Sequence, residues 1–250
     1  SAGGGQQVRS WVSPGWSWYE TVPLPRIMDS RCGTVKYQTL MPQEIAAMPE
    51  PETDLRTHHT RLLEGMARCV ASQGYADTTI ADIVREAGVS RRTFYEYFTD
   101  KPGCLIALHE AASQNALAVL RSAINPDRGW EQQVEQAIGA YLGALAQNPV
   151  LMRALFVDIL GLGLPGLVAR RRANQQLADF MREVVNQQPS GPVLLHKAMA
   201  MAVVGGINEL VLQAIEQDRV AQLADLVAPA SALLRAVVTA QSAVPGFEEK

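Results

Sequence analysis

The sequence has few cysteines and no long apolar run. Cys32, Cys69 and Cys104 are the three cysteines, and no two of them have the close spacing of a zinc site or a redox dithiol. We therefore expect a reducing compartment, the cytoplasm. The longest nearly apolar run, residues 198–207, is far shorter than the roughly 20 residues that a membrane helix needs. The amino terminus has no apolar stretch behind a charged start, so we expect neither a signal peptide nor a membrane segment.

Signals of catalysis and of metal binding are also missing. His58, His59, His109 and His196 share no helix face with cysteines or carboxylates at a metal spacing. The sequence pairs no nucleophile with a general base, and it has no phosphate-binding glycine loop. We therefore expect no metal, no cofactor and no enzymatic activity. An all-α enzyme that uses an internal cavity stays open as an alternative of another class.

A strong excess of charge of one sign is absent. The 250 residues hold 22 Lys and Arg against 25 Asp and Glu, and 48% of them are hydrophobic. Such a chain can form one large or two smaller globular domains. Residues 54–101 contain seven basic and seven acidic side chains. Any contact with nucleic acid must therefore come from a few well-placed groups and not from a basic surface.

Strand-like alternation is missing as well, and from about residue 55 apolar side chains recur at helical spacing. This pattern predicts an all-α protein. Residues 1–52 are interrupted by proline and glycine, so we expect a flexible amino-terminal extension there, and a short tail at 245–250. Later helices, bounded by proline or glycine, are expected at about 102–124, 129–147, 150–160, 166–187, 192–217 and 221–240, with Pro229 interrupting the last.

Three helices are expected between residues 53 and 101. The first ends at Gly74, because glycine tolerates the left-handed turn that follows a helix. Thr79 and Asp82 fit a variant of the capping box at the start of the second helix, which stops at Gly88. The hydroxyl of Ser90 then caps a third, short helix by accepting a hydrogen bond from a nearby backbone N–H. Two short helices joined by such a short turn have the spacing of a helix-turn-helix motif.

The third helix has a polar face that a protein core does not need. Phe94 and Phe98 lie one turn apart and are expected to face inward, which leaves arginines and tyrosines outside. Arginine near the start of such a helix can bond to guanine in the major groove, and a threonine methyl can contact thymine. Tyrosine hydroxyls and a lysine are suited to phosphate oxygens. A solvated arginine pair with half-buried tyrosines is the alternative interpretation.

The stretch "GYADTTIADIVREAGVSRRTFYEYFTDKPGCLIAL" resembles the DNA-binding domain of the tetracycline-repressor (TetR) family of bacterial regulators. The resemblance runs from Leu62 to about Leu108 and departs from the family pattern at Gly65 and Val84, where alanine is usual. It implies a helix-turn-helix domain at 53–101 that binds double-stranded DNA. The residues expected at the DNA are Thr79, Ser90, Arg91, Arg92, Thr93, Tyr95, Tyr97 and Lys101.

The family pattern also implies that residues 102–244 form a helical domain that binds a small-molecule effector and makes a homodimer. The expected dimer residues repeat at helical spacing late in the chain: Ile207, Leu210, Val211 and Ile215. Candidates for the ligand pocket are polar or bulky residues within apolar helices, each of which is also consistent with ordinary core packing: Trp130, Tyr141, Met152, Phe156, Phe180, His196, Met201 and Asn208.

The expected function is therefore that of a ligand-responsive transcriptional regulator. As a repressor it would bind a palindromic operator as a dimer and be released by its effector, because one short helix reads only a few base pairs. A regulator or activator with the same DNA-binding domain but no effector is the main alternative. The sequence does not identify the effector, the operator or the regulated genes.

Overall fold

The computed structural model describes residues 51–125, 127–187 and 194–243, and every regular element within them is helical. The prediction of an all-α fold is confirmed. Residues 1–50 of the expected extension and the tail at 245–250 lie outside the described residues. The first helix begins at Pro51, slightly before the expected boundary.

The second and third helices begin and end where the local sequence predicts, whereas the first continues to Asp77 past a non-helical Gly74, where it was expected to end. The three helices are α1 (Pro51–Asp77), α2 (Ile80–Ala87) and α3 (Arg91–Tyr97). Gly74 and Gly88 have positive φ angles of 81° and 62°, the region that favours glycine. The Thr79 side chain accepts from the Asp82 backbone N–H, and the Asp82 carboxylate accepts from that of Thr79, so the capping box is present.

A small core joins these three helices. Leu62 and Met66 of α1, Ile83 of α2 and Phe94 of α3 are fully buried. Gly65 lies where α1 crosses α2, and a side-chain carbon there would come within 2.8 Å of the carbonyl oxygen of Ile83. The two helices can approach this closely because glycine has no side chain. The departure from alanine at this position therefore has a packing reason.

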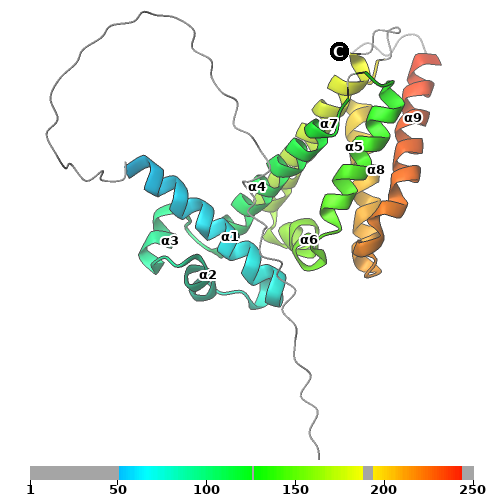
Figure 1. Cartoon of the computed structure of the whole chain (residues 1–250). Coiled ribbons are helices and arrows are strands. Elements are labelled where there is room, and N and C mark those ends of the chain that lie inside the picture. The colour runs from blue at the N-terminus through cyan, green and yellow to red at the C-terminus, as the bar shows by residue number, and fades with distance from the viewer. Residues whose placement is uncertain (1–50, 126, 188–193, 244–250) are drawn as a thin grey trace, which may run out of the picture. The chain divides into compact units, whose positions relative to one another are not determined.

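The rest of the described chain is a helical bundle, and α4 joins it to the first three helices (Figure 1). Helix α4 packs against α1, α5 and α7; α8 packs on α7, and α9 on α5 and α8. The elements are α4 (Lys101–Ser122), α5 (Trp130–Leu145), α6 (Pro149–Phe156), the 3-10 helix η1 (Asp158–Leu162), α7 (Leu164–Asn186), α8 (Lys197–Glu216), the 3-10 helix η2 (Val220–Leu226) and α9 (Val227–Ala243).

Two of the expected helices are divided in the structure. The helix expected at 150–160 is α6 followed by η1, and the one expected at 221–240 is η2 followed by α9. The interruption expected at Pro229 falls close to it, because η2 ends at Leu226 and α9 begins at Val227. Pro229 lies in the first turn of α9, where a backbone N–H has no partner within the helix and proline is therefore tolerated.

Helix α8 and the segment formed by η2 and α9 are strongly apolar, although much of their apolar surface is not buried within the bundle. By length and composition, Lys197–Glu216 and Val220–Gln241 could each cross a membrane, and the bent pair Trp130–Leu145 and Pro149–Leu162 could form a third span. Only 44% of the apolar window in α8 and 28% of that in the Val220–Gln241 segment are buried. The expectation that no segment enters a membrane rested on run length and stays a prediction.

Candidate DNA interface and ligand cavity

Helix α3 presents its arginines to solvent because its phenylalanines hold the opposite face to the core. Phe94 is fully buried, Phe98 is nearly so, and their ring centroids lie 5.5 Å apart. Arg91 and Arg92 are exposed at the start of the helix. Tyr95, 55% exposed, follows one turn later. This arrangement can place guanidinium groups against base edges when α3 enters a major groove.

The two arginines differ in their contacts. The Arg92 side chain is 90% exposed and forms an ion pair with Glu96, with Nε 3.2 Å from Oε1. A pair exposed to this degree contributes little, so it holds Arg92 only weakly. Within the described residues Arg91 has no hydrogen bond or ion pair. Both guanidinium groups are therefore available to DNA.

The hydroxyl groups of the predicted site shape the two helix starts. Ser90 Oγ accepts from the backbone N–H of Thr93 at 3.0 Å and lies 2.9 Å from Thr93 Oγ1. Thr79 Oγ1 donates to Asp82 Oδ2 at 2.6 Å, and Arg85 donates to the other carboxylate oxygen. The hydrogen bonds from Thr79 and Arg85 lower the pKa of Asp82 to about 2. The carboxylate therefore stays charged and keeps the capping box closed in neutral solution.

Lys101, which the sequence predicts as a phosphate contact, has partners within the protein. Its Nζ donates to the carbonyl oxygens of Tyr75, Ala76 and Thr78 at 3.0, 3.4 and 2.9 Å. It also lies 4.3 Å from the centre of the Tyr75 ring. The ammonium group thus closes the end of α1, where carbonyl groups lack partners within the helix. This role depends on the fold that brings residues 75–78 to the start of α4.

Other side chains that position the DNA-binding helices carry no signal in the sequence. Arg61 donates to the carbonyl oxygen of Gly88, at 2.9 Å. Arg68 Nε lies 2.7 Å from Glu86 Oε1 and also bonds the Glu86 carbonyl oxygen. Tyr97 is half-buried, and its ring meets His59 of α1 edge-on at 5.7 Å. These contacts tie α1 to both helices of the helix-turn-helix.

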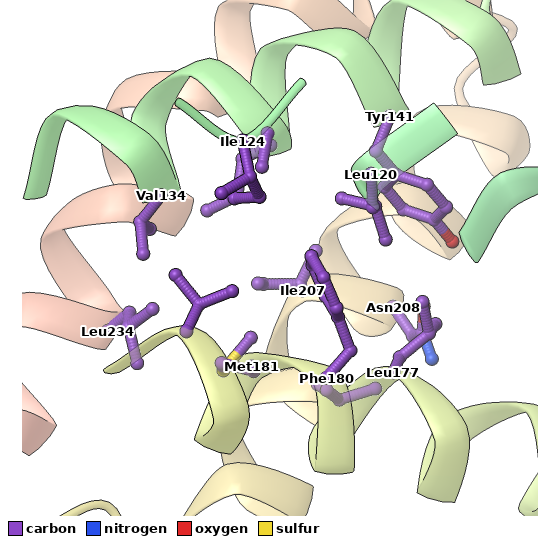
Figure 2. Close-up of a pocket in the computed structure, with 14 residues that line it drawn as sticks. Leu120, Ile124, Val134, Tyr141, Leu177, Phe180, Met181, Ile207, Asn208 and Leu234 are labelled. Carbon is purple, nitrogen blue, oxygen red and sulfur yellow. The ribbon is translucent and has the colours of Figure 1, made fainter. Parts of the chain in front are cut away.

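An apolar cavity lies within the bundle (Figure 2). It encloses about 550 Å³ of empty space, counting the part open to solvent, and the centres of water molecules can occupy about 60 Å³ of it. Its wall combines α4, α5, α7, α8 and α9 with the residue Ile124 that follows α4. The lining consists of Leu120, Ile124, Val134, Ala137, Ile138, Tyr141, Leu177, Phe180, Met181, Val184, Val204, Ile207, Asn208 and Leu234.

Two polar side chains lie on the same side of this cavity. Figure 2 shows Tyr141 and Asn208 together, away from Val134 and Leu234. Burial raises the pKa of Tyr141 to about 12, so its hydroxyl keeps its proton and can donate. The Asn208 amide nitrogen donates to Asn174 Oδ1 at 2.8 Å, which orients the buried amide. The cavity can therefore hold an apolar molecule with a hydrogen-bonding group at one end.

The structure brings three of the predicted pocket residues to this cavity, namely Tyr141, Phe180 and Asn208. The other five lie elsewhere: Trp130 begins α5, Met152 and Phe156 belong to α6, His196 precedes α8, and Met201 is a half-buried residue of α8 that does not line the cavity. Helix α6 packs mainly against α1, which explains the position of its two residues. Most of the lining is aliphatic, and no local pattern separates it from ordinary core.

The residues predicted for the dimer also need correction. Ile207, Val211 and Ile215 are buried within the protomer, with exposures of 7%, 0% and 6%. Ile207 lines the apolar cavity, and Leu210 is half-buried. The helical stripe was identified correctly, but it faces the protomer's own bundle. An amphipathic pattern shows that one face is buried without showing against what.

Comparisons with known proteins agree with this geometry. The family "Bacterial regulatory proteins, tetR family" matches residues 62–108, which span most of α1, all of α2 and α3, and the start of α4. Residues 62–108 belong to a TetR-family DNA-binding domain. The HTH-type transcriptional regulator BetI of Escherichia coli is 28% identical over 137 residues, which cover 51% of this chain and 70% of BetI. This TetR-family protein is accordingly a DNA-binding transcriptional regulator.

Two further comparisons define how far the likeness extends. YxbF, an uncharacterized HTH-type regulator of Bacillus subtilis, is 29% identical over 79 residues, which cover 32% of this chain and only 21% of YxbF. The fatty acid degradation regulator FadR from Bacillus halodurans has the same fold, with a TM-score of 0.57, 20% identity, and coverage of 75% of this chain and 96% of FadR. FadR from Bacillus subtilis, in complex with stearoyl-CoA, has a TM-score of 0.57 and 19% identity, covering 70% and 97%.

Replacing Arg91 or Arg92 by alanine tests the base contacts of the TetR-family helix. We expect each variant to lose preference at particular operator positions, at a cost of about 1–3 kcal/mol if a bidentate contact to guanine is lost. The operator is first obtained by selection from a randomised duplex library, and affinities are then compared across single base changes. Glu96→Gln serves as the control, because it frees Arg92 without removing it. Unchanged base preference in both arginine variants would show that α3 does not read the operator.

Replacing Lys101 tests its structural role. We expect Lys101→Met to lower the free energy of unfolding by about 1.5–3 kcal/mol, because hydrogen bonds from a charged donor to the end of α1 are lost. The salt dependence of DNA binding should stay the same. Chemical denaturation and salt-titrated binding measure the two quantities. A decrease of about one in the salt slope, without a change in stability, would instead make Lys101 a phosphate contact.

Proposed function

We propose that this TetR-family protein is a cytoplasmic repressor that binds a palindromic operator as a homodimer and releases it when an apolar small molecule fills the bundle. The observation that carries the proposal is the apolar cavity with Tyr141 and Asn208 on one side. Such a cavity favours a ligand with an apolar body and one hydrogen-bonding group. The acyl ligand of Bacillus subtilis FadR belongs to the same broad chemical class.

Helix α4 is the proposed link between the cavity and DNA. Near its end, Leu120 lines the cavity, and at its beginning Lys101 is bonded to the end of α1. A ligand that displaces Leu120 therefore pushes on a helix whose other end holds the DNA-binding helices. Moving the population from 1:99 to 99:1 requires about 5.5 kcal/mol of preference for the non-binding conformer. Only a ligand that fills the cavity differently in the two conformers can supply it.

The proposed dimer surface is the outer face of α8 and α9. Ala198 and Ala202 of α8 are exposed, as are Ala232 and Ala236 of α9. These small side chains let helices from two protomers approach closely. Both helices carry more apolar character than the protomer buries, and a second copy would cover the remainder. Dimerisation also supplies the second half-site that a single α3 cannot read.

A series of n-alkanols from hexanol to decanol tests the ligand site, because each combines an apolar chain with one hydroxyl group. We expect saturable binding by calorimetry and weaker operator binding over the same concentration range. Operator should weaken alkanol binding by the same factor, since linkage is reciprocal. Ala137→Phe, which fills the cavity, should abolish both effects. Gln136→Phe, at an exposed position of the same helix, is the matched control.

The outcome also separates the alternatives. An alkanol that binds and stabilises the protein but leaves operator affinity unchanged would contradict ligand release of DNA. It would favour a regulator controlled in another way, or an activator. Reporter transcription with the selected operator placed at a promoter distinguishes repression from activation. Chemical conversion of a bound ligand would revive the alternative of an all-α enzyme.

A further inference from the structure

A second cavity lies between α1, α4 and α7, apart from the apolar one. The centres of water molecules can occupy about 380 Å³ of it, compared with about 60 Å³ in the apolar cavity. The apolar part of its lining is made of small side chains at successive turns of α4 and α7, together with Leu63 of α1. The small residues are Ala107, Ala111, Ala169 and Ala173.

Two polar pairs connect α4 to α7 beside these alanines. Glu110 Oε1 lies 3.5 Å from Arg172 Nη1, and Gln114 Nε2 donates to Gln176 Oε1 at 3.0 Å. The side chains of Glu110 and Arg172 are 47% and 71% exposed, so their ion pair contributes little to stability. Another carboxylate can therefore replace Glu110 on Arg172 at small cost. The guanidinium group offers such a carboxylate two parallel hydrogen bonds.

The charge around this cavity favours an anion. Arg170, Arg171 and Arg172 follow one another on α7, and Glu110 is the one carboxylate among the described residues that line the cavity. The positive charge of Arg170 also reaches α4, where it adds to burial in lowering the pKa of His109. The lining itself has one positive and one negative side chain, Arg172 and Glu110, and Arg170 beside it on α7 adds a further positive charge.

The third wall of the cavity connects it to the DNA-binding helices. His59 of α1 lines the cavity, and its ring lies 5.7 Å from that of Tyr97 and 5.4 Å from that of Phe98. Tyr97 ends α3, and Phe98 is the residue that caps it. Burial lowers the pKa of His59, so the imidazole is neutral at pH 7 and can pack against an apolar group. An occupant of this cavity is thus one side chain away from α3.

We propose that this second cavity binds a small organic carboxylate. Its carboxylate group takes the place of Glu110 on Arg172, and its apolar body lies on the alanines toward His59. Binding breaks one of the two polar pairs beside the alanines and adds a contact next to α3. The site is separate from the apolar cavity, and the inference does not depend on alkanol binding there.

Calorimetry of the full chain with benzoate and 4-hydroxybenzoate tests the proposal, and benzamide and 4-hydroxybenzamide are the neutral matched probes. We expect the acids to bind at least about tenfold more tightly than the amides, because only the acids form the charged bidentate pair. Arg172→Gln should weaken acid binding about tenfold, whereas Glu110→Gln should strengthen it by removing the competing carboxylate. Arg171→Gln removes the same charge from an exposed position outside the lining and is the control.

A spectroscopic measurement locates the ligand independently. The imidazole signals of His59, identified with His59→Gln, should shift on titration with benzoate, and they should not shift in Ala111→Leu, where the larger side chain fills the cavity. Three results would overturn the proposal: no saturable binding of either acid, equal binding of acids and amides, or the same loss in Arg171→Gln as in Arg172→Gln. Circular dichroism confirms that each variant is folded before it is titrated.

Discussion

Operator affinity falls roughly 100-fold or more when Ala202 and Ala236 are both replaced by glutamate, if the outer face of α8 and α9 forms the dimer. Both positions are exposed in the protomer, so the substitutions leave its core intact. In a symmetric dimer the four new carboxylates would be buried near one another without partners. Burying an unpaired charge costs about 3–5 kcal/mol, and about 1.4 kcal/mol corresponds to a tenfold change in affinity.

Light scattering and operator titration measure the two consequences, assembly and DNA binding. Gln132→Glu with Gln136→Glu adds the same charge to an exposed face of α5 and serves as the control. All samples are kept free of detergent, so that a membrane-bound state of the apolar helices would appear as insolubility of the parent protein. A parent protein that is monomeric at micromolar concentration, or a double variant that still dimerises, would disprove the proposed interface.

The stability of the protein should fall by about 3 kcal/mol between pH 6.5 and pH 4 because of one buried histidine. His109 is 7% exposed, and its Nδ1 has no hydrogen-bond partner among the described residues. Burial, and then the charge of Arg170, lower its pKa from 6.5 to about 4. In this pH range the His109 imidazole binds a proton in the unfolded chain but stays neutral in the folded chain. The free energy of unfolding therefore decreases as the pH falls through it.

Replacing His109 by phenylalanine should remove this part of the pH dependence, because no titrating group remains at the position. Denaturation curves at intervals between pH 4 and pH 7 give the slope for each protein. Leu108→Val is the matched control on the same helix, since it weakens the core but keeps the histidine and thus the slope. Equal slopes in the parent and in His109→Phe would show that this imidazole gains its proton at the same pH in both states.

Much of the DNA-binding unit could be predicted from the sequence because its signals are local. A cap such as Ser90 acts on a backbone N–H three residues away, and Gly88 is required by the angles of its own residue. The separation of Phe94 from the arginines of α3 likewise follows from one turn of helix. These features need no partner from elsewhere in the chain. The helix-turn-helix, its exposed arginines and the resemblance to the TetR family can therefore all be identified from the sequence.

The position of the cavity and the direction of each helix face were decided by tertiary structure. Ile207 and Val211 form a stripe whose period is plain in the sequence, yet only the packing of α8 on its neighbours shows that the stripe faces the protomer's own bundle. Lys101 is a basic residue just after the recognition helix, and its sequence position therefore predicts a phosphate contact. Only the fold shows that three backbone carbonyl groups surround its ammonium group. A helical pattern determines which residues share a face. What that face meets depends on elements distant in the chain, and no local interaction encodes it.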